Sequence, residues 1–115
     1  MTTWDRRAIL DLGPMTEAFG TIDDEAKAAL ALFLSTIRPL LSSIQMRLLA
    51  GDLPGAAADA HSAKGAANVT GAFRLGALCD EICRQLKQGD STEAQNVLAL
   101  VPDAIDEVQA AIRRL

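Results

Sequence analysis

The sequence contains a single histidine, His61, and the residues that follow it at helical spacing could support chemistry on its imidazole. Lys64 and Gly65 come three and four residues later, and Asn68 comes seven residues later. Because each residue turns an α-helix by about 100°, these side chains share one side of a helix, at the rim of its apolar face. Two further positions continue this side toward the N-terminus of the helix: Ala57 and Pro54. We call these six residues the His61 strip, and expect it to be flat and partly exposed.

The residue types on the His61 strip suit transfer of a negatively charged group. A neutral imidazole is a nucleophile, and the ammonium group of Lys64 would stabilise negative charge arriving at the ring, as in phosphoryl transfer. Asn68 could hydrogen-bond the same group. Glycine inside a helix costs about 1 kcal/mol relative to alanine, yet alanine is common elsewhere in this helix. The absent methyl group of Gly65 therefore indicates clearance for a large partner, which points to a protein surface.

Two other interpretations of His61 compete with this one. A histidine with a lysine three residues later can simply be a solvated pair on a helix surface. A catalytic triad of Asp59, His61 and Ser62 is suggested by proximity in sequence. Neighbouring helical residues diverge by about 100°, however, so these three side chains cannot hydrogen-bond in series.

The two cysteines, Cys79 and Cys83, are predicted to be buried thiols of one helix. Four residues apart on a helix, their Cβ atoms would be separated by roughly 5–6 Å, whereas a disulfide needs about 3.5–4.5 Å. A structural zinc site needs about four ligands from cysteine, histidine or carboxylate. With one histidine in the chain, we predict no metal site and no cofactor of its own.

Composition and charge limit the kinds of partner. The chain of 115 residues has a formal net charge of −4, and its 11 lysines and arginines form no long block. Nucleic acid is therefore not an expected partner, because neutralising phosphates needs a basic face. No apolar run is expected to span a membrane, and the N-terminus lacks the apolar core of a signal peptide. We expect one soluble, cytoplasmic domain over residues 1–115.

Apolar residues recur at spacings of three and four along most of the chain, which predicts helices at about 22–50, 53–69, 72–88 and 91–114. Pro39 should kink the first of them and Pro102 should bend the last. A short helix over Pro14 to Gly20 should cover one end. Long amphipathic helices joined by short loops favour an all-α fold, an antiparallel up-down four-helix bundle with a short N-terminal helix.

The residues around His61 also resemble a known family. The run from His61 to Ala67 fits the pattern H-x-L-K-G-[SA]-[SA] of histidine-containing phosphotransfer (HPt) domains. The similarity covers about residues 10–113. Further positions match downstream and upstream of the run: Gly71-Ala72, Leu75, Leu78, Cys79, Phe33-Leu34, Pro39 and Leu49 to Asp52.

The resemblance implies a phosphorelay carrier without a kinase or nucleotide site. In such domains an exposed histidine accepts a phosphoryl group from a receiver-domain aspartate and passes it to another receiver. Carried over by position, His61 is the phosphorylated residue and Lys64 the flanking cation, while Gly65, with Ala57 and Pro54 beside it, lies where the receiver docks. The partners implied are response-regulator receiver domains and a hybrid sensor kinase, with Mg²⁺ brought by the receiver. The domain should be a monomer.

The chain departs from the family pattern at two places. Ala63 replaces the usual larger apolar residue between the histidine and the lysine, and Ile82-Cys83 stands where many members have Leu-Glu. The first change should thin the packing under the strip. The alternative function is a helical protein-binding or regulatory module that does not use His61 for phosphotransfer. A domain of a hybrid sensor kinase is a third interpretation, although the initial methionine favours a free-standing protein.

Overall fold

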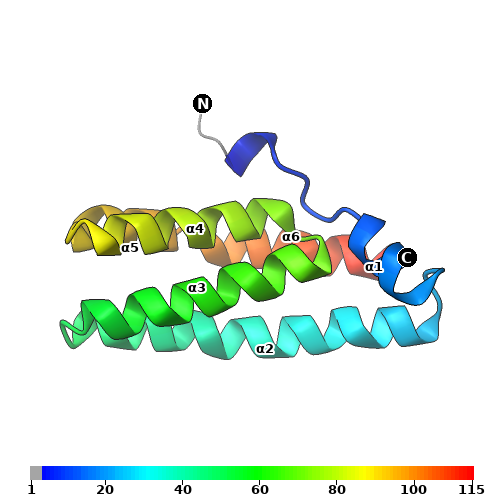
Figure 1. The fold of residues 1–115 in the computed structure, drawn as a ribbon, viewed down its shortest axis with the longest axis horizontal. Helices are drawn as coiled ribbons and strands as arrows, with labels where there is room; N and C mark the ends of the chain where they lie inside the picture. Colours follow the sequence, from blue (N-terminus) through cyan, green and yellow to red (C-terminus); the bar gives the residue numbers. More distant parts are fainter. Residues whose placement is uncertain (1–3) are drawn as a thin grey trace.

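The computed structural model describes residues 4–115, and in that range every regular element is helical (Figure 1). Residues 1–3, including the initial methionine, lie outside the described range. The all-α class is confirmed. The elements in chain order are the 3₁₀ turn η1 (Trp4–Arg6) and the helices α1 (Gly13–Phe19), α2 (Asp24–Leu49), α3 (Leu53–Thr70), α4 (Phe73–Lys87), α5 (Ser91–Leu98) and α6 (Val101–Arg113).

Aspartates begin three of the helices. The side chains of Asp23, Asp52 and Asp90 accept hydrogen bonds from backbone N–H groups in the first turns of α2, α3 and α5, at 3.0–3.1 Å. Such caps satisfy donors that have no partner within the helix. Helix α2 continues through Pro39 without ending, and α3 ends at Gly71 in the left-handed conformation.

The helix expected at about 91–114 is interrupted, and this corrects the prediction of one continuous, bent helix. Helix α5 ends at Leu98, and α6 begins at Val101. Pro102 occupies the first turn of α6. Proline has no N–H to donate and its ring clashes with the carbonyl group four residues earlier, here that of Leu98. The proline therefore starts a new helix instead of bending an existing one.

Helix α3 lies along both α2 and α4 and runs in the opposite direction to each of them (Figure 1). Its inner face consists of small buried residues: Ala56, Ala60, Ala63 and Ala67. Because alanine keeps the backbones of neighbouring helices close, the bulk of the core comes from the other helices. The large side chains that are almost fully buried include Leu30, Ile37, Ile44, Leu75, Ile82 and Ile105.

Both cysteines are free and buried, as expected. Burial raises the pKa of the Cys79 thiol to about 12, because a thiolate would lose its hydration inside the core. Cys79 therefore remains a thiol across the physiological pH range.

Helix α2 is long and apolar enough to cross a membrane by length and composition alone. The expectation that no apolar run reaches this length is therefore wrong for α2. The core helix of a soluble protein meets the same criterion. In this structure Leu30, Ile37 and Ile44 of α2 are buried, whereas Leu32, Met46 and Leu49 are exposed.

An N-terminal arm, residues 4–12, folds back over the junction between α3 and α4. The N–H of Asp11 donates to the carbonyl oxygen of Gly71 at 2.8 Å, and the N–H of Arg74 donates to that of Ala8 at 2.9 Å. The Arg74 guanidinium also donates to the carbonyl oxygens of Arg7 and Asp5, each at 3.3 Å. The arm is thus attached to the start of α4 through its backbone.

Polar side chains fasten the connection between α2 and α3. Arg47, in the last turn of α2, donates to Asp52 at 2.7 Å and to Asp59 at 3.0 Å, and Ser43 also donates to Asp59. The N–H of Gly55 and the Arg47 guanidinium hold the pKa of Asp52 below its ordinary value of 3.8. A lowered pKa in the folded state means that ionised Asp52 favours folding above about pH 4, and that this contribution is lost as the pH falls through the folded-state pKa.

We therefore expect Asp52→Asn to weaken the pH dependence of stability in acid. Asparagine keeps an oxygen that can cap α3 but carries no charge for Arg47. The measurement is the free energy of unfolding by urea for wild type and variant from pH 6 to pH 3. The difference between the two proteins should shrink toward pH 3. A constant difference over this range would contradict the assignment.

Candidate functional site

The His61 strip lies on the outer side of α3. His61, Gly65, Asn68 and Pro54 are exposed, while Ala57 and Lys64 are half-buried. A Cβ atom built on Gly65 would meet no atom within 4 Å, apart from its own helix backbone and chain neighbours. The surface beside the imidazole is therefore open, and no packing contact within the described chain explains the glycine.

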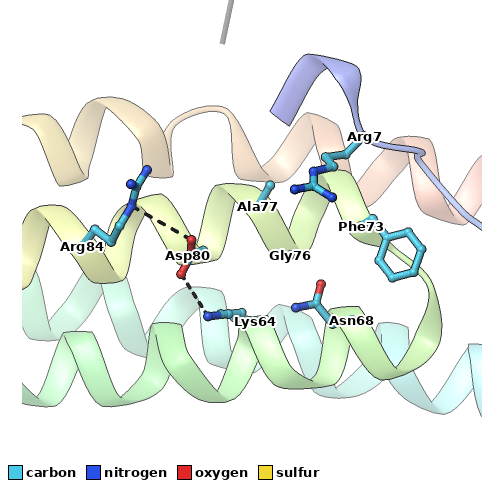
Figure 2. A pocket seen from close by; sticks show the side chains of 8 residues that line it. All are labelled: Arg7, Lys64, Asn68, Phe73, Gly76, Ala77, Asp80 and Arg84. Atoms are coloured by element: carbon cyan, nitrogen blue, oxygen red, sulfur yellow. Dashed lines mark hydrogen bonds and ion pairs between the residues drawn. The ribbon is translucent and has the colours of Figure 1, made fainter. Parts of the chain in front are cut away.

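Lys64 and Asn68 turn toward α4 and line a groove between the two helices (Figure 2). Lys64 donates to an oxygen of Asp80 on α4 at 3.0 Å. Asn68 reaches over Gly76. Its side-chain oxygen lies 2.1 Å from the position that a Cβ atom on Gly76 would take. The groove has a volume of about 370 Å³ and is also lined by Arg7 of the N-terminal arm.

Lys64 is thus half of an ion pair in the free protein. The side chains of Lys64 and Asp80 are 36% and 42% exposed, and an exposed pair of this kind contributes at most about 1 kcal/mol. The second oxygen of Asp80 lies 4.0 Å from the guanidinium of Arg84. Because the pair is weak, the ammonium group could leave Asp80 for a stronger anion at small cost.

Sequence reasoning did not identify Asp80 or Gly76, although the junction at Ala72 contained the signal. In a tight antiparallel hairpin of two helices, residues equally distant from the junction lie at the same level. Lys64 and Asp80 each lie eight residues from Ala72, and Asn68 and Gly76 each lie four residues from it. The register of the hairpin therefore predicts both pairings.

Val69 is a second omission. It lies four residues after Gly65 and eight after His61, so it continues the open side of α3 by one turn. Its side chain is 71% exposed. A single exposed apolar side chain is ordinary on a protein surface, so what distinguishes Val69 is its place on the open side of α3.

The structure also separates residues that are close in sequence. Asp59 accepts hydrogen bonds from Ser43 and Arg47 on α2, so its carboxylate faces away from the His61 strip and takes no part in a triad.

The thiol of Cys83 donates to the carbonyl oxygen of Ala57 at 3.7 Å. Among residues 4–115, no group of three or more histidine, cysteine or acidic side chains could hold a metal ion.

The packing under the strip leaves only a small void at Ala63, although the small side chain predicts thinner packing. Ala63 is buried and borders a cavity of about 10 Å³, between residues of α2, α4, α5 and α6. A space of this size is at the lower limit for one water molecule, and its lining of apolar side chains such as Ile37 and Leu98 gives water no good hydrogen-bond partner. The cavity is too small for the larger apolar side chain that HPt domains usually carry here.

Comparison with protein families places most of the chain in one of them. Residues 28–111 match the family model described as Hpt domain. The match excludes the N-terminal arm and α1, so it begins later than the similarity at about residue 10. Comparison with curated proteins and with solved structures gives no significant match. The chain belongs to the Hpt domain family, whose role is that of a phosphotransfer carrier in two-component phosphorelays.

Proposed function

We propose that His61 is the residue on which this carrier holds the phosphoryl group. The observation that carries the proposal is its place on α3, exposed and beside the open surface at Gly65, within the part of the chain that matches the family. Domains of this family are phosphocarriers that interact with receiver domains, not kinases. The donor is the acyl phosphate of a receiver aspartate, and a second response-regulator receiver is the acceptor.

The chemical step is a displacement at phosphorus. An imidazole nitrogen of His61 attacks with its lone pair, an N–P bond forms, and the bond between phosphorus and the aspartyl oxygen breaks. The aspartate leaves as a carboxylate. Transfer to the second receiver reverses these events. The receiver supplies Mg²⁺ and most of the electrostatic stabilisation, and this chain supplies the nucleophile.

The ammonium group of Lys64 changes its partner when His61 is phosphorylated. With no phosphoryl group present it pairs with Asp80, and a phosphoryl group with a charge near −2 on the neighbouring turn competes for the same ammonium group. Asn68 provides an amide beside it. Pro54, Ala57, Gly65 and Val69 form the flat surface that the receiver covers, and Val69 adds an apolar contact.

The family architecture extends to the helices. We interpret α2, α3, α4 and the interrupted α5–α6 as the four helices of an antiparallel bundle, with η1 and α1 added at the N-terminus. The protein works as a cytoplasmic monomer with a hybrid sensor kinase and response regulators as partners. The competing function is a helical binding module that does not use His61.

Phosphate uptake tests the proposal. A receiver domain charged with radiolabelled acetyl phosphate is incubated with the full chain, and label on the chain is assayed before and after acid treatment. We expect acid-labile label on wild type and none on His61→Ala, whereas Ser62→Ala, the neighbouring exposed position, should be labelled as wild type. Uptake that survives loss of His61 would overturn the proposal. A wild type that binds the receiver and takes no label would favour the binding module.

A further inference from the structure

The N-terminal arm contributes one wall of the groove beside the His61 strip, although it lies outside the family match. Arg74 donates hydrogen bonds to three backbone carbonyl oxygens of the arm, those of Arg7, Ala8 and Asp5. Figure 2 shows the Arg7 side chain extending from the arm toward α4, opposite Lys64 and Asn68 on α3. The arm is therefore held so that Arg7 faces the groove.

The groove is locally positive in a chain of net charge −4. Three cationic side chains line it, Arg7, Lys64 and Arg84, against one carboxylate, Asp80. The two oxygens of Asp80 face Lys64 and Arg84, and Arg84 also pairs with Glu81. Within residues 4–115 the guanidinium of exposed Arg7 has no ion-pair partner. The positive charge without compensation in this groove is therefore that of Arg7.

The groove and the His61 strip are one continuous surface. Lys64 and Asn68 belong to both, and the groove continues from them across Gly76 and Ala77 to α4 and the arm. A protein seated over His61 would therefore cover the groove as well. An acidic segment of that protein would provide the negatively charged partner that Arg7 does not have within residues 4–115.

We propose that Arg7 is a specificity-determining residue that binds an acidic segment of the receiver domain docked over His61. This inference rests on the proposed function and adds a contact from a segment outside the family match. Because the arm is attached through backbone hydrogen bonds, the Arg7 side chain is available for the partner. Receivers with an acidic segment at this edge should be preferred over receivers that are neutral or basic there.

Transfer kinetics test the proposal with the full chain. Initial rates of label transfer from a receiver charged with acetyl phosphate are measured against receiver concentration in low salt. For Arg7→Glu we expect KM for the receiver to rise about five- to tenfold, with kcat within about twofold of wild type. Added salt should reduce this difference, since exposed charges are screened. Arg7→Lys, which keeps the charge, should stay within about twofold of wild type.

Two controls separate the possible results. Arg114→Glu makes the same change of charge at an exposed position in the C-terminal part of the chain. An equal effect of Arg114→Glu, or an unchanged KM for Arg7→Glu, would overturn the inference. Phosphoramidate, a small donor that needs no receiver, should label His61 equally in wild type and Arg7→Glu. If the receiver never transfers label to wild type, the proposed function fails, and the role of Arg7 fails with it.

Discussion

Leucine in place of Gly65 should leave the helices folded and slow phosphoryl transfer from a receiver domain by about 100-fold. The fold should tolerate the change because a Cβ atom at this position meets nothing within 4 Å. Leucine also favours a helix over glycine by nearly 1 kcal/mol, so the free energy of unfolding should stay equal or increase. The loss of transfer follows from distance, because a side chain beside His61 holds the aspartyl phosphate away from the imidazole.

A graded series makes this prediction sharper. Gly65→Ala adds one methyl group and should slow transfer less than Gly65→Leu does. Ala31→Leu adds similar bulk at an exposed position of α2 and should leave transfer unchanged. Phosphoramidate should still label His61 in all three variants, because a small donor needs little clearance. Equal transfer by Gly65→Leu and wild type would show that the receiver does not approach over this glycine.

The fold class and the composition of the His61 strip were predictable because both depend on local periodicity. Apolar residues three and four apart identify α2, α3 and α4. A rotation of about 100° per residue places Gly65 beside His61. The open side of α3 follows from the same rotation. Val69 was accessible to this reasoning, since it lies on the same side as Gly65.

The interrupted helix was harder to predict because competing local preferences decide it. Val97, Val101 and Ile105 keep helical spacing across the break between α5 and α6, and all three are buried. The apolar pattern therefore continues although the backbone hydrogen bonds do not. Pro102 signals either a bend or a new start, and only the packing of both pieces against α4 decides between them.

The arm left no signal in the apolar pattern. Its attachment consists of backbone hydrogen bonds from Asp11 and Arg74 and of the guanidinium of Arg74. Backbone groups are the same at every position, so their pairing cannot be predicted from residue types. The ion pair of Lys64 with Asp80 lies between these cases, because it needs the register of the α3–α4 hairpin.

Among substitutions of a glycine of this chain by alanine, Gly71→Ala should be the most destabilising. Gly71 has φ of +97°, which residues with a Cβ atom adopt at a cost of about 1–2 kcal/mol. A Cβ atom there would also lie 2.0 Å from the backbone oxygen of Asp11. Backbone cannot move aside as a flexible side chain can, so the arm must separate from the junction. We expect a total loss of about 3–4 kcal/mol in the free energy of unfolding.

Gly89→Ala provides the matched control for this loss. Gly89 also has a positive φ, +77°, but a Cβ atom there would meet nothing within 4 Å. Its substitution should therefore cost only the conformational part, about 1–2 kcal/mol. The difference between the two variants in urea unfolding measures what the close approach of the arm contributes. In Gly71→Ala the amide of Asp11, which donates to Gly71 in wild type, should also exchange its hydrogen faster. If both variants lose the same stability and the amide of Asp11 already exchanges fast in wild type, the arm is not held at the junction, and Arg7 has no fixed place beside the His61 strip.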